Sequence, residues 1–131
     1  MRQQSDKTQL SASQEDYLEA IFQVQREKTT VRAKDIAARL EVTGASVTGA
    51  LHALSEKALI HYAPYGSVTL TSRGRRVAAD IVRRHQALRD FFVRVLGVDE
   101  ETAQVSACRM EHALSDVLLD RLVAYVEDVT T

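Results

Sequence analysis

The sequence predicts a mainly α-helical protein with one short β-hairpin near the middle of the chain. Only one Pro and five Gly occur among 131 residues, which is too few turn-forming residues for an all-β protein. Apolar residues recur at helical spacing through most of the chain. The exception is 59–71, where two β-type segments flank the turn Ala63–Gly66. Pro fixes φ in this turn, and Gly is free to take a positive φ.

The order of elements before this hairpin predicts a winged helix-turn-helix. The segment 31–40 begins as a short extended piece and continues as a short Ala-rich helix. A break at 41–44 separates it from a second helix expected over 45–58. Two short helices joined by a turn that contains Gly are typical of a helix-turn-helix. The hairpin follows the second helix directly, which is the place of a wing.

Two longer helices are expected on either side of this motif. Ser11 and Gln14 resemble a capping box in front of a helix over about 12–27. Ser72 is a candidate N-cap for a long helix over about 73–96, and Gly97 is the residue type that ends helices.

Two more helices complete the expected fold. Asp99–Glu101 places acidic residues in the first turn of a helix that runs to about Leu114. Ser115 then caps a last helix over about 116–127. We expect a DNA-reading domain over 1–72 and a helical domain over 73–131.

Charge is unevenly distributed along the chain. Residues 1–92 contain 14 Lys and Arg and 10 Asp and Glu, a net charge of +4, whereas residues 93–131 contain 3 and 8, a net charge of −5. A basic half is compatible with nucleic acid. No apolar run is long enough for a membrane helix, residues 1–9 do not read as a secretory signal, and a single Cys108 excludes an internal disulfide. These features predict a cytoplasmic protein without a membrane partner.

Three groups of polar residues at helical spacing suggest a metal site. Asp16 and Glu19 share a face of the first helix, His85 lies in the long helix, and the triplet Cys108, Glu111 and His112 shares a face of the fifth. Thiolate, carboxylate and imidazole together suit Mn, Fe, Co, Ni or Zn. The alternative interpretation is a solvated acidic face, a packed His and a buried Cys.

Several segments together resemble the diphtheria toxin repressor and manganese transport regulator family. They are Glu15–Ile21, the helix-turn-helix over 33–57, Leu70–Gly74, Arg84-His85, Leu96–Val98 and Cys108–Ser115. The resemblance covers nearly the whole chain after residue 10. It implies a homodimeric repressor that binds double-stranded operator DNA when Fe(II) or Mn(II) is loaded, with no other protein partner evident. It also implies that the second domain is the helical dimerisation and metal-binding domain.

The resemblance also implies which residues bind the metal. Carried over by position, the ligands are Asp16, Glu19, His85, Cys108, Glu111 and His112. Asp16 and Glu19 match manganese-type members, whereas Cys108 matches iron-type members. A thiolate favours Fe(II) slightly, and Zn(II), Co(II) or Ni(II) can substitute in vitro. The metal is expected to tie the first helix to the second domain and to fix a dimer whose recognition helices lie about 34–36 Å apart.

The winged helix also predicts DNA and dimer contacts. Base edges are expected to meet the start of the recognition helix, and phosphates to meet basic residues and the wing tip. The DNA-contact candidates are Thr43, Ala45, Ser46 and Thr48 for bases and Arg32, Lys34, Lys57, Tyr65 and Arg73 for phosphates. The dimer candidates are Leu88, Phe91, Phe92, Val95, Leu118, Leu122 and Val126, which could instead form only the core of one chain.

Two other functions compete with the metal-dependent repressor. One is a winged-helix regulator that senses an oxidant through Cys108, or a small organic ligand, without a metal. The other is a metal hydrolase that uses Glu111 as a base, which is disfavoured because no nucleophile or oxyanion motif is evident. We expect the protein not to be an enzyme.

Overall fold

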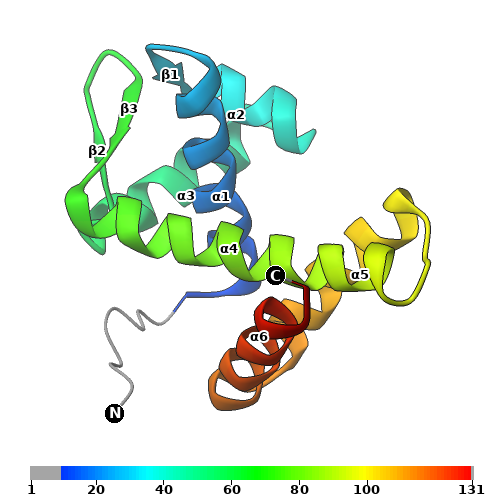
Figure 1. Cartoon of the computed structure of the whole chain (residues 1–131). Coiled ribbons are helices and arrows are strands. Elements are labelled where there is room, and N and C mark those ends of the chain that lie inside the picture. Colours follow the sequence, from blue (N-terminus) through cyan, green and yellow to red (C-terminus); the bar gives the residue numbers. More distant parts are fainter. Residues whose placement is uncertain (1–9, 131) are drawn as a thin grey trace. The chain divides into compact units, whose positions relative to one another are not determined.

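The computed structural model describes residues 10–130 and is mainly helical, as the sequence predicts (Figure 1). The elements in chain order are α1 (Ala12–Glu27), β1 (Val31–Arg32), α2 (Ala33–Leu40), α3 (Gly44–Glu56), β2 (Ile60–Tyr62), β3 (Ser67–Leu70), α4 (Ser72–Arg94), α5 (Glu100–Ala113) and α6 (Asp116–Thr130). The chain divides into two compact units between Ala79 and Asp80, inside α4. Among the described residues, no helix is long and apolar enough to cross a membrane.

The capping box predicted before α1 is confirmed. The Gln14 backbone N–H donates to Ser11 Oγ, and the Ser11 backbone N–H donates to Gln14 Oε1, each at 3.1 Å. Both N–H groups lie at the start of the helix, where no carbonyl of the preceding turn is available to them. The inner face of α1 then buries Leu18 and Ile21 completely.

The three strands form one antiparallel sheet in the order β1-β3-β2. Val31 pairs with Val68, and Ile60 pairs with Leu70 across the other edge of β3. All four side chains are buried, so one face of the sheet completes the core of the first unit. The extended piece expected at 31 is therefore a strand of the wing sheet.

The turn between α2 and α3 differs from the prediction in one respect. The sequence places Gly44 in the turn, whereas the structure begins α3 with Gly44. The residue with left-handed backbone is Glu41, at φ 56° and ψ 50°. Thr43 is the N-cap of α3 and accepts from the Ser46 backbone N–H at 3.1 Å.

The start of α4 is held by Thr71 and Gly74. The Gly74 backbone N–H donates to Thr71 Oγ1 at 2.9 Å, so the capping side chain is Thr71 rather than the predicted Ser72. A Cβ at Gly74 would lie 1.9 Å from the Leu59 carbonyl oxygen. Glycine at this position therefore allows α4 to pack directly on the chain at the end of α3.

The second unit contains the rest of α4 with α5 and α6. Gly97 takes φ 71° just beyond α4, which is the helix-ending role predicted for it. Asp99 is the N-cap of α5, and Ser115 Oγ accepts from the Leu118 backbone N–H at the start of α6. The core of this unit is Ala87, Leu88, Ala107, Leu119, Val123 and Val126.

Candidate metal and DNA sites

A buried carboxylate and a buried imidazole pair with each other among the predicted metal ligands of the second unit. His85 Nδ1 on α4 lies 2.7 Å from Glu111 Oε1 on α5. The two side chains are only 8% and 3% exposed. Such polar groups are costly to bury unless they are paired with each other or with a metal. These two residues are 26 positions apart in sequence, so only the fold brings them together.

The other two predicted ligands of this unit lie beside Glu111 on α5. Cys108 and His112 are half-buried, and Cys108 stands three residues before Glu111 and four residues before His112. Residues at this spacing share a face of a helix. One thiolate, one carboxylate and two imidazoles fit a divalent transition metal and differ from the all-oxygen ligands preferred by Mg²⁺ or Ca²⁺.

The first unit carries the remaining predicted ligands, Asp16 and Glu19. Both lie on α1 and are half-buried, three residues apart. Glu19 Oε2 accepts from Gln23 Nε2 at 3.4 Å. The structure therefore places these two carboxylates on one face of α1, as their spacing predicts.

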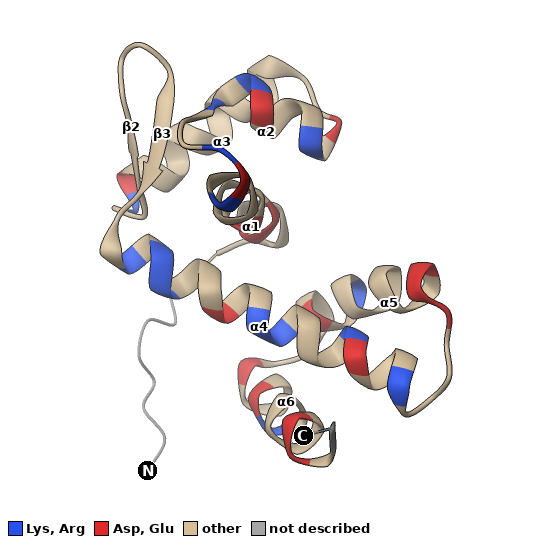
Figure 2. Ribbon diagram, turned by 45° about the horizontal axis from the view of Figure 1, so that its top comes forward, with Lys and Arg blue, Asp and Glu red and all other residues tan. Residues whose placement is uncertain are grey.

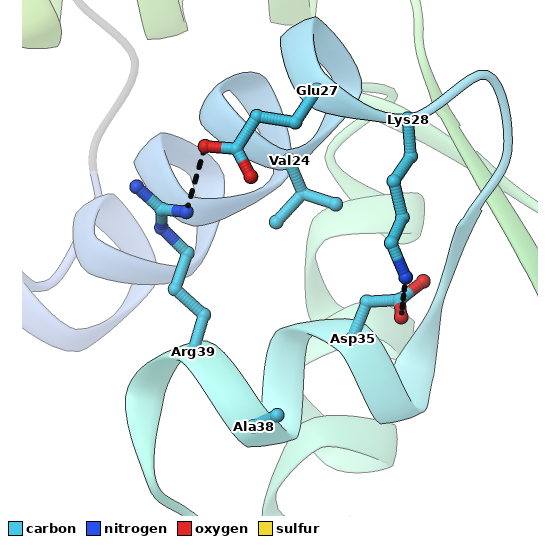
Figure 3. Close-up of a pocket in the computed structure, with 6 residues that line it drawn as sticks. All are labelled: Val24, Glu27, Lys28, Asp35, Ala38 and Arg39. Atoms are coloured by element: carbon cyan, nitrogen blue, oxygen red, sulfur yellow. Dashed lines mark hydrogen bonds and ion pairs between the residues drawn. The ribbon is translucent and has the colours of Figure 1, made fainter.

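A hollow of about 320 Å³ lies between α1 and α2 and is lined mostly by charged side chains, as Figure 3 shows. Lys28 Nζ lies 2.8 Å from Asp35 Oδ1, and Arg39 Nη1 lies 3.3 Å from Glu27 Oε2. The Lys28 side chain, and then the Arg32 backbone N–H, lower the pKa of Asp35 by hydrogen bonding. The acidic groups here are engaged by cations, so this hollow does not offer a cation site.

The start of α3 presents the residues predicted to read DNA. Ala45, Ser46 and Thr48 are exposed, as is the N-cap Thr43. Thr43 Oγ1 donates to Ser46 Oγ, and Thr48 Oγ1 donates to the Gly44 carbonyl, each at 3.0 Å. The two threonine hydroxyls therefore face outward mainly as acceptors, while the Ser46 hydroxyl keeps its own proton.

The basic candidates divide into exposed residues and residues that make contacts within the first unit. Arg32 is exposed, and its Nη1 donates to the carbonyl of Tyr65, which is 75% exposed at the tip of the β2–β3 hairpin. Lys34 is also exposed. In contrast, Arg73 Nη1 donates to the Lys57 carbonyl at 2.7 Å, and Lys57 Nζ donates to Gln14 Oε1 at 3.3 Å. These last two contacts tie the C-terminal end of α3 to its neighbours and require no DNA.

The predicted dimer residues separate by burial. Leu88 and Val126 are 1% and 0% exposed inside the core of the second unit, which fits the alternative that they form the core of one chain. Phe91, Phe92 and Leu122 pack against the same core and are partly buried. Val95 and Leu118 are mostly exposed, at 51% and 54%.

The exposed surface of α6 is more apolar than the sequence prediction anticipated. Leu118, Tyr125 and Val129 lie seven and four residues apart, so they form a stripe along one side of the helix. Tyr125 is 61% exposed and Val129 is 46% exposed, and neither was among the predicted dimer residues. The buried residues Leu119 and Val123 lie on a separate stripe of the same helix.

Comparison with known families covers both units. Residues 9–68 match the model described as "Iron dependent repressor, N-terminal DNA binding domain". Residues 71–131 match "Iron dependent repressor, metal binding and dimerisation domain". The chain belongs to this family of metal-dependent transcriptional repressors, with a DNA-binding domain followed by a metal-binding and dimerisation domain. This confirms the family resemblance and the fold class predicted from the sequence.

Individual relatives agree with this assignment. The chain is 39% identical over 119 residues to the HTH-type transcriptional regulator MntR of Bacillus velezensis, and the match covers 88% of this chain and 83% of that protein. It is 32% identical over 116 residues to the diphtheria toxin repressor of Corynebacterium efficiens, with 88% and 50% covered. The relatives are transcriptional regulators, and none of these names describes an enzyme.

The structural comparison gives the same family. A manganese-dependent transcriptional repressor, solved in complex with manganese, superposes with a TM-score of 0.75 at 35% identity. The match covers 87% of this chain and 52% of that chain. This chain therefore spans about half the length of that repressor and of the diphtheria toxin repressor.

Proposed function

We propose that this protein is a homodimeric repressor that binds operator DNA when a divalent metal is loaded, and that it controls metal-uptake genes. The observation that carries the proposal is the buried His85–Glu111 pair at 2.7 Å, with Cys108 and His112 beside Glu111 on α5. This donor set lies in the part of the chain that matches the metal-binding and dimerisation domain. We keep 1–72 and 73–131 as the proposed limits of the two domains.

The proposed ligands are the six residues carried over by the resemblance. Glu111, His85, Cys108 and His112 come from the second unit, and Asp16 and Glu19 come from α1. When bound, the metal supplies positive charge that offsets the mutual repulsion of the carboxylates. Fe(II) or Mn(II) is the proposed effector, with Fe(II) slightly favoured because a hard Mn(II) ion gains little from the Cys108 thiolate.

The proposed coupling between metal binding and DNA binding follows from the positions of the ligands along the chain. Asp16 and Glu19 belong to the DNA-binding half, whereas the other ligands belong to the dimerisation half. A metal that binds both groups restricts the motion of one half against the other, which raises the population of dimers able to read successive major grooves. Couplings of this kind are typically about 1–3 kcal/mol, which is roughly 5- to 150-fold in affinity.

The test is fluorescence anisotropy on labelled duplexes from upstream of the protein's own gene and of metal-uptake genes. The protein is prepared anaerobically, stripped with a chelator, and titrated with Fe(II), Mn(II) or Zn(II). We expect DNA affinity to rise about tenfold or more with Fe(II) or Mn(II). The double variant Asp16→Ala, Glu111→Ala should lose this response.

Asp90→Ala is a matched control, because Asp90 is an acidic residue of α4 outside the proposed ligand set and its partner Arg89 keeps an ion pair with Glu100. It should keep the metal response. Equal DNA binding by stripped and loaded wild-type protein would contradict the metal switch. In that case the alternative regulator, which senses an oxidant through Cys108 or an organic ligand, becomes the leading candidate.

A further inference from the structure

The exposed side of α3 carries two large side chains, His52 and, at the C-terminal end of the helix, Glu56. Ala45, Thr48 and His52 are all exposed and lie three and four residues apart, so they share one side of the helix. Val47, Leu51 and Leu54 occupy the inner side and are fully buried. No Lys or Arg occurs in Gly44–Glu56, and the one charged residue of this helix is its last, Glu56. Figure 2 accordingly shows most of α3 without charge colours (Figure 2). His52 is therefore the large side chain on this side of α3 that can donate a hydrogen bond, since the Glu56 carboxylate only accepts.

The imidazole of His52 is held against the wing. Its ring centroid lies 5.5 Å from that of Tyr62, with an interplanar angle of 62°, an edge-to-face contact. Tyr62 belongs to β2 and its backbone pairs with Val68 of β3, so the sheet holds the backbone from which this ring projects. A side chain that is already restricted loses less conformational entropy when it binds a ligand.

His52 also adds a hydrogen-bond donor to the exposed side of α3, where few donors are available. The hydroxyl protons of Thr43 and Thr48 are used inside the helix, by Ser46 Oγ and the Gly44 carbonyl. These hydroxyls face outward as acceptors, whereas an imidazole always carries at least one N–H. The residues at 49 and 53, beside His52, are small. A Cβ at Gly49 would meet nothing within 4 Å, and Ala53 carries a single methyl group.

We propose that His52 reads a guanine in the operator by donating a ring N–H to its major-groove edge. This inference rests on the proposed DNA-binding function and adds a specificity-determining residue to it. Guanine is the base that fits, because both of its major-groove atoms, N7 and O6, are acceptors. Adenine sets a donor beside its acceptor, thymine offers one acceptor, O4, beside a methyl group, and cytosine offers only a donor.

The test is selection from a library of randomised duplexes by the Mn(II)-loaded wild-type protein and by His52→Phe. Phenylalanine keeps an aromatic ring against Tyr62 and removes both nitrogens. We expect the wild type to select guanine at one position of each half-site. The variant should lose that preference alone, keep the remaining positions, and unfold at the wild-type temperature.

A second measurement uses 7-deazaguanine at the selected position, which removes the N7 acceptor. Wild-type affinity should fall by about fivefold, the low end of the value of a base contact, while His52→Phe should not respond. The comparison of guanine with 7-deazaguanine in the wild-type protein remains informative even if the variant folds poorly. The proposal is overturned if the variant selects the same guanine, or if it weakens binding to every sequence equally. A wild type that selects no sequence would contradict the proposed operator binding itself, because phosphate contacts alone carry no sequence preference.

Discussion

α3 and α6 are both amphipathic helices, but their exposed sides differ in chemistry. Each has an inner stripe that is fully buried, Val47, Leu51 and Leu54 in α3 and Leu119, Val123 and Val126 in α6. The exposed side of α3 carries Ala45, Thr48 and His52, which are small or polar. The exposed side of α6 carries Leu118, Tyr125 and Val129, which are apolar.

This difference shows how one packing scheme can serve two kinds of partner. A small polar surface lets a helix approach base edges and their bound water closely. An apolar stripe left outside the core of its own chain is typical of a protein contact. The two sides match the DNA-binding domain and the dimerisation domain assigned to these residues.

The largest expected effect is on the free energy of unfolding, and it distinguishes a buried position of α3 from an exposed position of α6. Leu51→Ala should lower the free energy of unfolding by about 3 kcal/mol, because Leu51 is completely buried and the change leaves a cavity. Leu118→Ala is the matched control on α6, where the side chain is 54% exposed. It should cost less than about 1 kcal/mol in urea unfolding at protein concentrations where the chain is monomeric. Equal losses would mean that Leu118 is a core residue.

The next effect concerns self-association through the exposed stripe of α6. Tyr125→Asp should weaken dimerisation about 30-fold or more, because burying an unpaired carboxylate in an apolar contact costs about 2 kcal/mol or more. Ala124→Asp adds the same charge one residue away, off the stripe but also exposed, and should change the dimer little. Sedimentation equilibrium measures both. The idea fails if Tyr125→Asp remains as dimeric as the wild type.

A smaller effect tests whether the exposed side of α3 is open. Gly49→Ala should raise the free energy of unfolding by about 0.5–1 kcal/mol, since alanine favours helix and a Cβ there meets nothing within 4 Å. Ala53→Gly is the reverse change in the same helix and should lower it by a similar amount. Thermal unfolding distinguishes the two. A loss of stability in Gly49→Ala would show that this surface is covered.

The smallest effect is a pH dependence at the start of α5. The Thr102 backbone N–H, and then the Thr102 side chain, lower the pKa of Asp99 by hydrogen bonding to its carboxylate. A folded-state pKa below the unfolded one stabilises the protein above the ordinary carboxylate pKa, and this stabilisation is lost as pH falls through the lowered value. Asp99→Asn cannot titrate. Its stability difference from the wild type should therefore shrink between about pH 5 and about pH 2 in chemical unfolding. A difference that stays constant over this range would contradict the assignment.

Local patterns allowed most of the secondary structure to be predicted. Ser11 with Gln14, Gly97, and Ser115 act where the sequence placed them, because caps depend on residues within one turn. The left-handed residues Glu41 and Ala58 were not anticipated, because neither is glycine. Thr71 takes the capping role expected of Ser72, and spacing alone does not distinguish adjacent hydroxyls.

The site was less predictable because it depends on tertiary packing. Helical spacing put Cys108, Glu111 and His112 on one face, but the 2.7 Å approach of His85 depends on how α4 and α5 pack. Apolar spacing likewise could not assign residues to core or surface. It grouped Leu88 and Val126, which are buried, with Leu118, which is exposed, and it left out Tyr125, which is also exposed.

The central claim is that metal and DNA bind to one coupled system, and reciprocity gives its most direct test. If metal raises DNA affinity by some factor, DNA must raise metal affinity by the same factor. The Mn(II) and Fe(II) affinities of the anaerobic, stripped protein are measured by competition with a metallochromic chelator, with and without saturating operator duplex. We expect the duplex to raise the affinity about tenfold or more. An unchanged metal affinity in the presence of bound duplex would contradict the account.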